Sequence, residues 1–406
     1  MSKALTVLDN CSFLLACLCA FLGMANVLSL QGYFLLFSTV LLLASLILHG
    51  LPKMGIPFWL LAIFGISYNA FCYLNGVWGV RDVVYFIFCP PVFYLLGSSS
   101  SENCDRRSIL FLCALASGMF LSAFSIILNT FLMQGIGLGH GQQLFPHFGS
   151  DEIMSRTGLS LYLMPACGVA VSTLFSFSPK KRQTFGNLIP MISSFFICLF
   201  SLFCSNQAGN RAFIVAFALL TVVGCITLIF RLKSNTAKTI LLLLVGFVML
   251  FSVLLVLGWV PPFLAKIPVF DRFLKGGSNE SRLNMYKQFL LNGWRKPFGG
   301  TFAYLDDYYL HNFWLDIYTF AGIVPFVIFS YLLVMAFTRY GRFKISNLST
   351  VPGIRLIFFV TVSFMAIGLF EPLFQANPFA FGPFALFFGA CASLKKKTVE
   401  IDVLRI

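Results

Sequence analysis

Long apolar stretches recur from one end of this sequence to the other, and they limit the fold more than any other feature. Apolar residues make up 59% of the 406 residues and charged residues only 10%. A water-soluble domain needs a far more charged surface than this. Helices of about 20 apolar residues satisfy their own backbone hydrogen bonds and cross a lipid bilayer. The sequence therefore predicts an all-α polytopic membrane protein, with residues 1–406 forming a single integral-membrane domain.

Twelve stretches are long enough to be transmembrane helices. Their predicted bounds are 11–30, 32–49, 56–74, 82–98, 108–131, 157–178, 188–205, 212–230, 240–260, 312–337, 354–374 and 379–394. Lys and Arg concentrate in alternate connections, and cationic loops stay on the cytoplasmic side. We therefore expect cytoplasmic N- and C-termini. The large outer segment 261–311, between helices 9 and 10, is far longer than an ordinary connection, so we expect a small subdomain there.

The formal net charge of +14 comes mostly from residues at the inner ends of the spans, which indicates membrane lipids rather than nucleic acid as partners. The 12 cysteines contain no Cys-x-x-Cys pair, so we expect neither a disulfide framework nor a zinc site. The Gly-rich outer segment 135–156 carries His140, His147, Asp151 and Glu152. Their spacing matches no metal motif. A solvated loop is the simpler interpretation, and the role of this segment stays open.

The outer segment 261–311 contains the signal for an amphipathic helix near 279–292. Ser278 is suited to cap the start of this helix and Gly293 to end it. Apolar side chains line one face, as on a helix that lies on the membrane surface or on the outer rim of the protein: Leu283, Tyr286, Phe289 and Leu290. The cations Lys287, Arg295 and Lys296 are interpreted as surface groups that reach lipid headgroups.

Two arginines open apolar spans at the outer edge. Arg211 follows the short polar connection 205–210. Its guanidinium and the backbone amides of this connection are together suited to bind a phosphate group. A structural role, with the side chain reaching toward water, is an equal alternative. Arg81 stands at the outer start of the fourth span, where positioning at a helix terminus is the favoured interpretation.

His311 lies where the large outer segment becomes the tenth span, and a neutral imidazole is the side chain best suited to accept a proton near neutral pH. A purely structural histidine is the alternative. Asn312 and Asp316 follow it, and a carboxylate inside an apolar span is costly. Glu371, at the outer end of the eleventh span, is explained by a turn. It can also pair with an arginine or orient His311, and both interpretations stay open.

One ordered set of residues resembles the O-antigen polymerase and O-antigen ligase superfamily of bacterial envelope glycosyltransferases. The set is Ser281-Arg282, Tyr286, Trp294, Pro297-Phe298-Gly299-Gly300, His311-Asn312, Leu315 and Gly322-Ile323-Val324-Pro325. The resemblance covers mainly residues 205–330, and the twelve-span topology agrees with it. It implies a GT-C-like enzyme of the bacterial inner membrane with a periplasmic site, an undecaprenyl-diphosphate-linked oligosaccharide as donor, and no cofactor or metal.

The resemblance also implies roles for single residues. Arg211 and Arg282 would bind the donor diphosphate, and His311 would be catalytic. Chemistry agrees, because guanidiniums stabilise a leaving diphosphate and an imidazole can take the proton of an attacking hydroxyl, which inverts the anomeric configuration. Further candidate substrate or orienting contacts are Asn312, Asp316, Tyr286, Tyr304, Tyr308, Glu371 and Arg81.

The two activities of the superfamily differ in the acceptor. A polymerase extends another lipid-linked glycan, whereas a ligase moves glycan to lipid A-core. The short interval from Arg282 to His311 and the run His311–Asp316 favour a polymerase, and a chain-length regulator is then a candidate partner. A flippase for lipid-linked sugars is the alternative from another class. Transporters, however, usually carry their polar residues near the bilayer midplane, and here polar residues gather at the outer edge.

Overall fold

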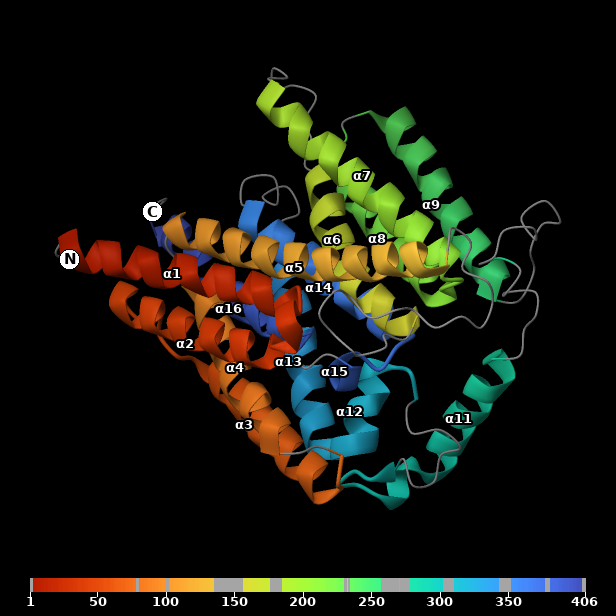
Figure 1. The fold of residues 1–406 in the computed structure, drawn as a ribbon, viewed down its shortest axis with the longest axis horizontal. Coiled ribbons are helices and arrows are strands. Elements are labelled where there is room, and N and C mark those ends of the chain that lie inside the picture. The colour runs from red at the N-terminus through yellow and green to blue at the C-terminus, as the bar shows by residue number, and fades with distance from the viewer. Residues whose placement is uncertain are drawn as a thin grey trace.

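The computed structural model describes residues 3–77, 80–99, 102–134, 156–175, 185–229, 232, 234–256, 270, 278–301, 310–342, 352–376 and 380–403. All regular secondary structure within these ranges is helical (Figure 1). The first half contains α1 (Lys3–Met24), α2 (Gln31–His49), α3 (Ile56–Leu74), α4 (Val80–Ser98), α5 (Glu102–Gln134), α6 (Arg156–Leu174) and α7 (Phe185–Gln207). The second half contains α8 (Arg211–Ile229), α9 (Asn235–Val256), α11 (Ser278–Asn292), α12 (Phe313–Ala321), α13 (Ile323–Arg342), α14 (Pro352–Gly368), α15 (Leu373–Ala376) and α16 (Phe381–Val403).

Seven helices in the described ranges are long and apolar enough to cross a membrane: Ala4–Met24, Gln31–His49, Ile56–Leu74, Arg106–Met133, Leu188–Gln207, Arg211–Ile229 and Ile323–Gly341. Five shorter apolar helices are Tyr85–Ser98, Gly158–Leu174, Asn235–Phe251, Gly353–Gly368 and Phe381–Leu394. Each of them overlaps one of the twelve stretches predicted from the sequence, although α1 (Lys3–Met24) begins and ends earlier than the predicted 11–30. The prediction of an all-α, multi-pass membrane protein is confirmed.

The tenth predicted span is broken, which the sequence pattern did not indicate. Residues 312–337 were expected to form one helix, but α12 ends at Ala321 and α13 begins at Ile323. Gly322 between them has a φ of 80°, and a Cβ there would clash with the carbonyl oxygen of Pro297. The Ile323 amide donates to that same oxygen at 2.8 Å. The contact with Pro297 therefore takes the place of the missing helical hydrogen bond.

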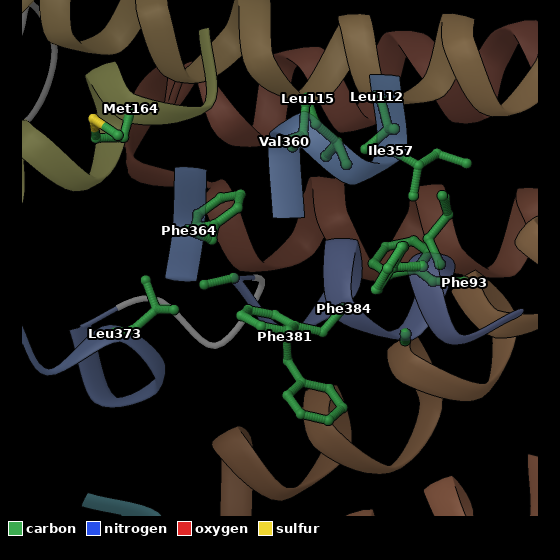
Figure 2. Packing of buried hydrophobic residues seen from close by; sticks show 14 of the residues in the cluster. Phe93, Leu112, Leu115, Met164, Ile357, Val360, Phe364, Leu373, Phe381 and Phe384 are labelled. Atoms are coloured by element: carbon green, nitrogen blue, oxygen red, sulfur yellow. The ribbon is translucent and has the colours of Figure 1, made fainter. Parts of the chain in front are cut away.

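Phenylalanines form much of the core where the C-terminal helices meet. Phe329 of α13, Phe374 of α15 and Phe381 of α16 are buried, and their ring centroids lie 5.2 to 5.8 Å apart. Figure 2 shows Phe364 of α14 and Leu115 of α5 in the same buried cluster. Aromatic pairs at such distances each add about 0.5–1.5 kcal/mol beyond the burial of their area. The first residues of α12 and α15, Phe313 and Leu373, belong to the same core cluster.

A buried ion pair joins three helices near the start of α1, the end of α2 and the start of α5. Arg107 donates from its two terminal nitrogens to Asp9 at 2.9 and 2.7 Å, in a bidentate arrangement. Ser45 donates to Asp9 at 2.6 Å, and His49 lies 3.3 Å from it. The side chains of Asp9 and Arg107 are only 2% and 11% exposed. Arg107 is thus a packing residue of the bundle, although it lies just outside the predicted span 108–131.

Small residues let α4 and α16 approach closely. A Cβ at Gly97 would clash with the carbonyl oxygen of Leu386, and a Cβ at Gly389 would clash with that of Tyr94. Glycines at helix contacts are characteristic of membrane proteins, where van der Waals packing rather than water exclusion holds helices together.

Replacement of Gly389 by alanine is expected to destabilise the bundle by about 1–3 kcal/mol, because the added methyl group must push α16 away from α4. Reversible unfolding of purified protein in detergent would measure the change. Gly246→Ala in α9 is the matched control, since a Cβ there meets nothing within 4 Å. Alanine is also the better helix former. Equal destabilisation by both variants would contradict the tight α4–α16 contact.

Candidate functional site

A small apolar cluster shows which helix ends lie together at the candidate site. Val215, one turn after Arg211 in α8, packs against Phe251 of α9, Phe270 and Phe370. Phe370 follows the end of α14. The start of α8, the far end of α9 and the chain that leaves α14 therefore meet at one end of the bundle.

The chain that enters α12 is held by its own polar side chains. The buried Leu310 donates its amide to Asp316 Oδ1 at 2.9 Å. Asn312 is the N-cap of α12, and its side-chain oxygen accepts from two amides of the first turn at 3.2 and 3.3 Å. From the sequence, Asn312 and Asp316 are candidate substrate or orienting contacts. In the structure these hydrogen bonds fix the backbone on either side of His311.

His311 itself has a left-handed backbone conformation, with a φ of 55°. This conformation is uncommon for residues other than glycine and costs about 1–3 kcal/mol. Histidine is among the residues that adopt it more readily. Strain of this kind persists only where the surroundings impose it, and it is frequent at functional sites. The flanking hydrogen bonds of Leu310 and Asn312 supply that constraint here.

The side chain of His311 lies next to Glu371. His311 Nδ1 is 3.7 Å from Glu371 Oε2. The glutamate side chain is 1% exposed and the histidine side chain 24% exposed. The sequence left three interpretations of Glu371 open: a turn, a pair with an arginine, or a contact that orients His311. The structure places Glu371 beside His311. A buried carboxylate is thus adjacent to an imidazole that is partly accessible to solvent.

Aromatic packing holds the segments that carry His311 and Glu371 at a fixed position relative to each other. Phe313, two residues after His311, and Phe374, three residues after Glu371, are both fully buried. Their ring centroids are 5.8 Å apart and their planes are nearly perpendicular, at 84°. Gly368 at the end of α14 faces the Phe313 ring, where a Cβ would come within 2.9 Å. The distance between His311 and Glu371 is therefore set by rigid core contacts rather than by a loop.

The glycine-rich turn after α11 packs on the break between α12 and α13. Asn75, just after α3, donates its side-chain amide to the carbonyl oxygens of Phe298 and Phe320 at 3.1 and 3.0 Å. Gly299 has a φ of 89°, and a Cβ there would clash with the Phe320 carbonyl. Sequence reasoning missed Asn75. Its only signal is a polar residue directly after an apolar span.

For the α7–α8 turn the sequence left two equal interpretations open, phosphate binding and a structural role. The amides of Ala208, Gly209 and Asn210 donate to carbonyl oxygens at the end of α7, at 2.8 to 2.9 Å. Asn210 is also the cap of α8, since its side chain accepts from the Phe213 amide at 3.2 Å. These three amides are therefore used within the turn itself. An anion-binding role for this turn rests on the half-buried side chain of Arg211.

The amphipathic helix predicted near 279–292 corresponds to α11, Ser278–Asn292. Met285 is buried, Phe289 contacts the ring of Tyr318 at 5.5 Å, and Tyr286 is half-buried. Leu290 is 77% exposed, so this member of the predicted apolar face does not pack on the protein. The Tyr318 hydroxyl donates to the Gly293 carbonyl at 3.1 Å, which fixes the end of α11 to α12.

Four other predicted site residues lie beyond what the structure describes. Tyr304 and Tyr308 fall outside the described residues altogether. The backbones of Arg81 and Arg282 lie in α4 and α11, but their side chains are outside the described part. The segment 135–156, with its two histidines, is outside it as well, except for Arg156 at the start of α6.

Within the described ranges, no group of three or more His, Cys, Asp or Glu side chains is arranged to hold a metal ion. What the described site offers is a carboxylate–imidazole pair, with an arginine at the same end of the bundle. Such a pair is suited to take a proton from a hydroxyl group, and the arginine is suited to hold an anion. A search of protein-family models and of curated proteins finds no match to this chain.

Proposed function

We propose that this chain is a membrane-embedded glycosyltransferase of the O-antigen polymerase type. Its donor is an oligosaccharide linked to undecaprenyl diphosphate, and its acceptor is another lipid-linked glycan. The single observation that carries the proposal is the partly accessible His311 beside the buried carboxylate of Glu371. The resemblance of residues 205–330 to the polymerase and ligase superfamily supplies the substrate class.

The proposal includes a topology of twelve spans in a bacterial inner membrane. The five shorter apolar helices then cross the membrane together with the seven long ones. Lys53 between α2 and α3, and Arg106 near the start of α5, are both exposed at what would be the inner ends of spans, which supports cytoplasmic termini. In Figure 1, α1 begins and α16 ends at the left of the view, whereas α11 lies at the right. The site would then face the periplasm.

The proposed reaction is a single displacement at the anomeric carbon of the donor sugar. A hydroxyl oxygen of the acceptor attacks that carbon, and the bond from the carbon to the diphosphate oxygen breaks. The electron pair leaves with undecaprenyl diphosphate. The hydroxyl proton passes to the imidazole of His311. Attack from the side opposite the leaving group inverts the configuration.

Arginines contribute by holding the leaving group. Charge on the diphosphate grows as the bond breaks, so fixed guanidiniums stabilise the transition state more than the ground state. Arg211 opens α8 at the end of the bundle that contains His311. Arg282 lies in α11, whose end is fixed to α12 through Gly293 and Tyr318.

Deletion of the gene in its source bacterium is the test. Loss of a polymerase leaves lipid A-core with a single glycan repeat, which a gel of surface polysaccharide resolves. Loss of a ligase leaves bare core with long glycan on the carrier lipid. Loss of a flippase leaves bare core without periplasmic polymer. We expect the single-repeat pattern.

Complementation by the wild-type gene should restore the ladder of chain lengths. The ligase pattern would show that the acceptor is lipid A-core and not another lipid-linked glycan. The flippase pattern would refute the proposal that the protein is a glycosyltransferase. An unchanged ladder in the deletion strain would refute every form of the proposal.

A further inference from the structure

Glu371 is buried to a degree that a carboxylate tolerates only with a partner. Its side chain is 1% exposed, and an isolated charge in such surroundings is very costly. In the part of the chain that the structure describes, His311 is its one ionisable partner within ion-pair distance. The pair therefore accounts for the burial of Glu371, which a simple turn at the end of α14 does not require.

The backbone on either side of Glu371 is held in place. The amides of Leu369 and Phe370 donate back to α14 carbonyls at 3.1 and 3.0 Å, so the helix closes tightly just before Glu371. Pro372 follows, and a residue before proline is held in an extended conformation. Leu373 and Phe374 are then fully buried in the core. Glu371 is thus anchored on both sides.

We propose that Glu371 is a positioning residue for His311: its carboxylate faces Nδ1, keeps the proton on that nitrogen, and so directs the basic Nε2 toward the acceptor hydroxyl. This inference rests on the proposed function. The separation of 3.7 Å is longer than a hydrogen bond, and such contacts commonly shorten when substrate binds. As His311 takes the hydroxyl proton it becomes a cation, and the adjacent carboxylate stabilises that cation.

Several other charged groups lie on the elements near His311, and they stay unchanged when Glu371 is replaced. Those in the described part are Asp316 on α12, Arg211 on α8, Lys287 on α11, Arg295 in the turn Gly293–Arg295, and Lys296 after it. Carboxylates favour the protonated imidazole and cations disfavour it. Removing the charge of Glu371 alone should therefore lower the pH at which His311 loses its proton.

The first measurement needs no substrate. The protein has 4 histidines, and the NMR signal of His311 is the one that disappears in His311→Ala. In Glu371→Gln the midpoint of the His311 titration is expected to fall by about one pH unit, because an opposite charge at this range shifts a titration by that amount or more. The amide keeps the size of the side chain. An unchanged midpoint in a folded variant would overturn the inference.

The second measurement is glycan transfer by the purified protein in lipid vesicles with lipid-linked donor and acceptor. Glu371→Gln should lower kcat about 100-fold and leave KM unchanged. The remaining activity should persist to lower pH than in the wild type. A merely structural role would instead lower kcat equally at all pH values, together with the melting temperature, and would refute the assignment.

Glu371→Asp decides the matter if Glu371→Gln does not fold. The aspartate keeps the charge but withdraws it by one methylene group, so the His311 midpoint and kcat should both fall, by less than in Glu371→Gln. No change in either would overturn the inference. His311→Ala separates the two proposals: if it still transfers glycan, the proposed function fails. If His311→Ala is inactive, but the His311 titration is the same in the wild type and in the Glu371 variants, only this inference fails.

Discussion

His311→Ala is expected to abolish the ladder of long glycan chains on the cell surface, because the variant has no group to take the proton of the acceptor hydroxyl. A general base contributes about 10²–10⁴ to a rate, so transfer should fall at least about 100-fold. The measurement is complementation of the deletion strain, with the amount of protein in the membrane determined by immunoblot. The left-handed backbone at His311 makes alanine unfavourable there, so the immunoblot is essential.

Arg211→Ala and Arg282→Ala are also expected to abolish the ladder of long chains. Each removes a positive charge that would stabilise the leaving diphosphate. Lys287→Ala is the matched control for Arg282. It removes a cation from the same helix, and Lys287 is exposed. A normal ladder in His311→Ala, Arg211→Ala or Arg282→Ala would contradict the assignment of that residue. A lost ladder in Lys287→Ala would show that charge on α11 in general, and not Arg282 in particular, is required.

Asp9→Ala is expected to cause a large loss of stability. It leaves Arg107 buried without its carboxylate, and breaking a buried ion pair in this way costs about 3–5 kcal/mol. The other hydrogen bonds of Arg107, to Ser45 and Asn10 at 3.2 and 3.1 Å, do not replace the lost charge. Unfolding of purified protein in detergent would measure the loss.

A double-mutant cycle with Arg107→Ala isolates the contribution of the pair, because the double variant removes both charges together. We expect the double variant to be more stable than the sum of the single losses predicts. Arg106→Ala is the control, since this neighbouring arginine is exposed and should change stability by less than about 0.5 kcal/mol. Strictly additive losses for Asp9 and Arg107 would contradict the pairing.

The positions of the helices were predictable because the length of an apolar stretch is a local property of the sequence. The predicted bounds 56–74 coincide with α3. Predicted ends were too short where polar residues continue a helix beyond its apolar part. The span predicted at 108–131 is the middle of α5, which begins at Glu102 and ends at Gln134.

Contacts between distant segments could not be predicted in the same way. The break at Gly322 depends on the Pro297 carbonyl, which belongs to the outer segment and not to the helix. Arg107 lies outside every predicted span, and only the fold shows that Asp9 neutralises it. A glycine or an arginine in sequence does not reveal which distant atom it will meet.

The candidate site shows the same limit. His311 and Glu371 were both identified as candidates from their places at the outer ends of predicted spans. Their proximity was only one of several interpretations, because it depends on the packing of Phe313 against Phe374 in the core. The burial of Glu371 likewise became evident only from the packed structure.

The close approach of α4 and α16 has a consequence for biosynthesis. Gly97 and Gly389 lie on either side of this contact, and most of the chain is translated between them. Throughout that interval the face of α4 around Gly97 must be covered by lipid or by another protein. Nascent chains released before α16 emerges from the ribosome would keep this face of α4 without its partner helix, and we expect membrane proteases to degrade them.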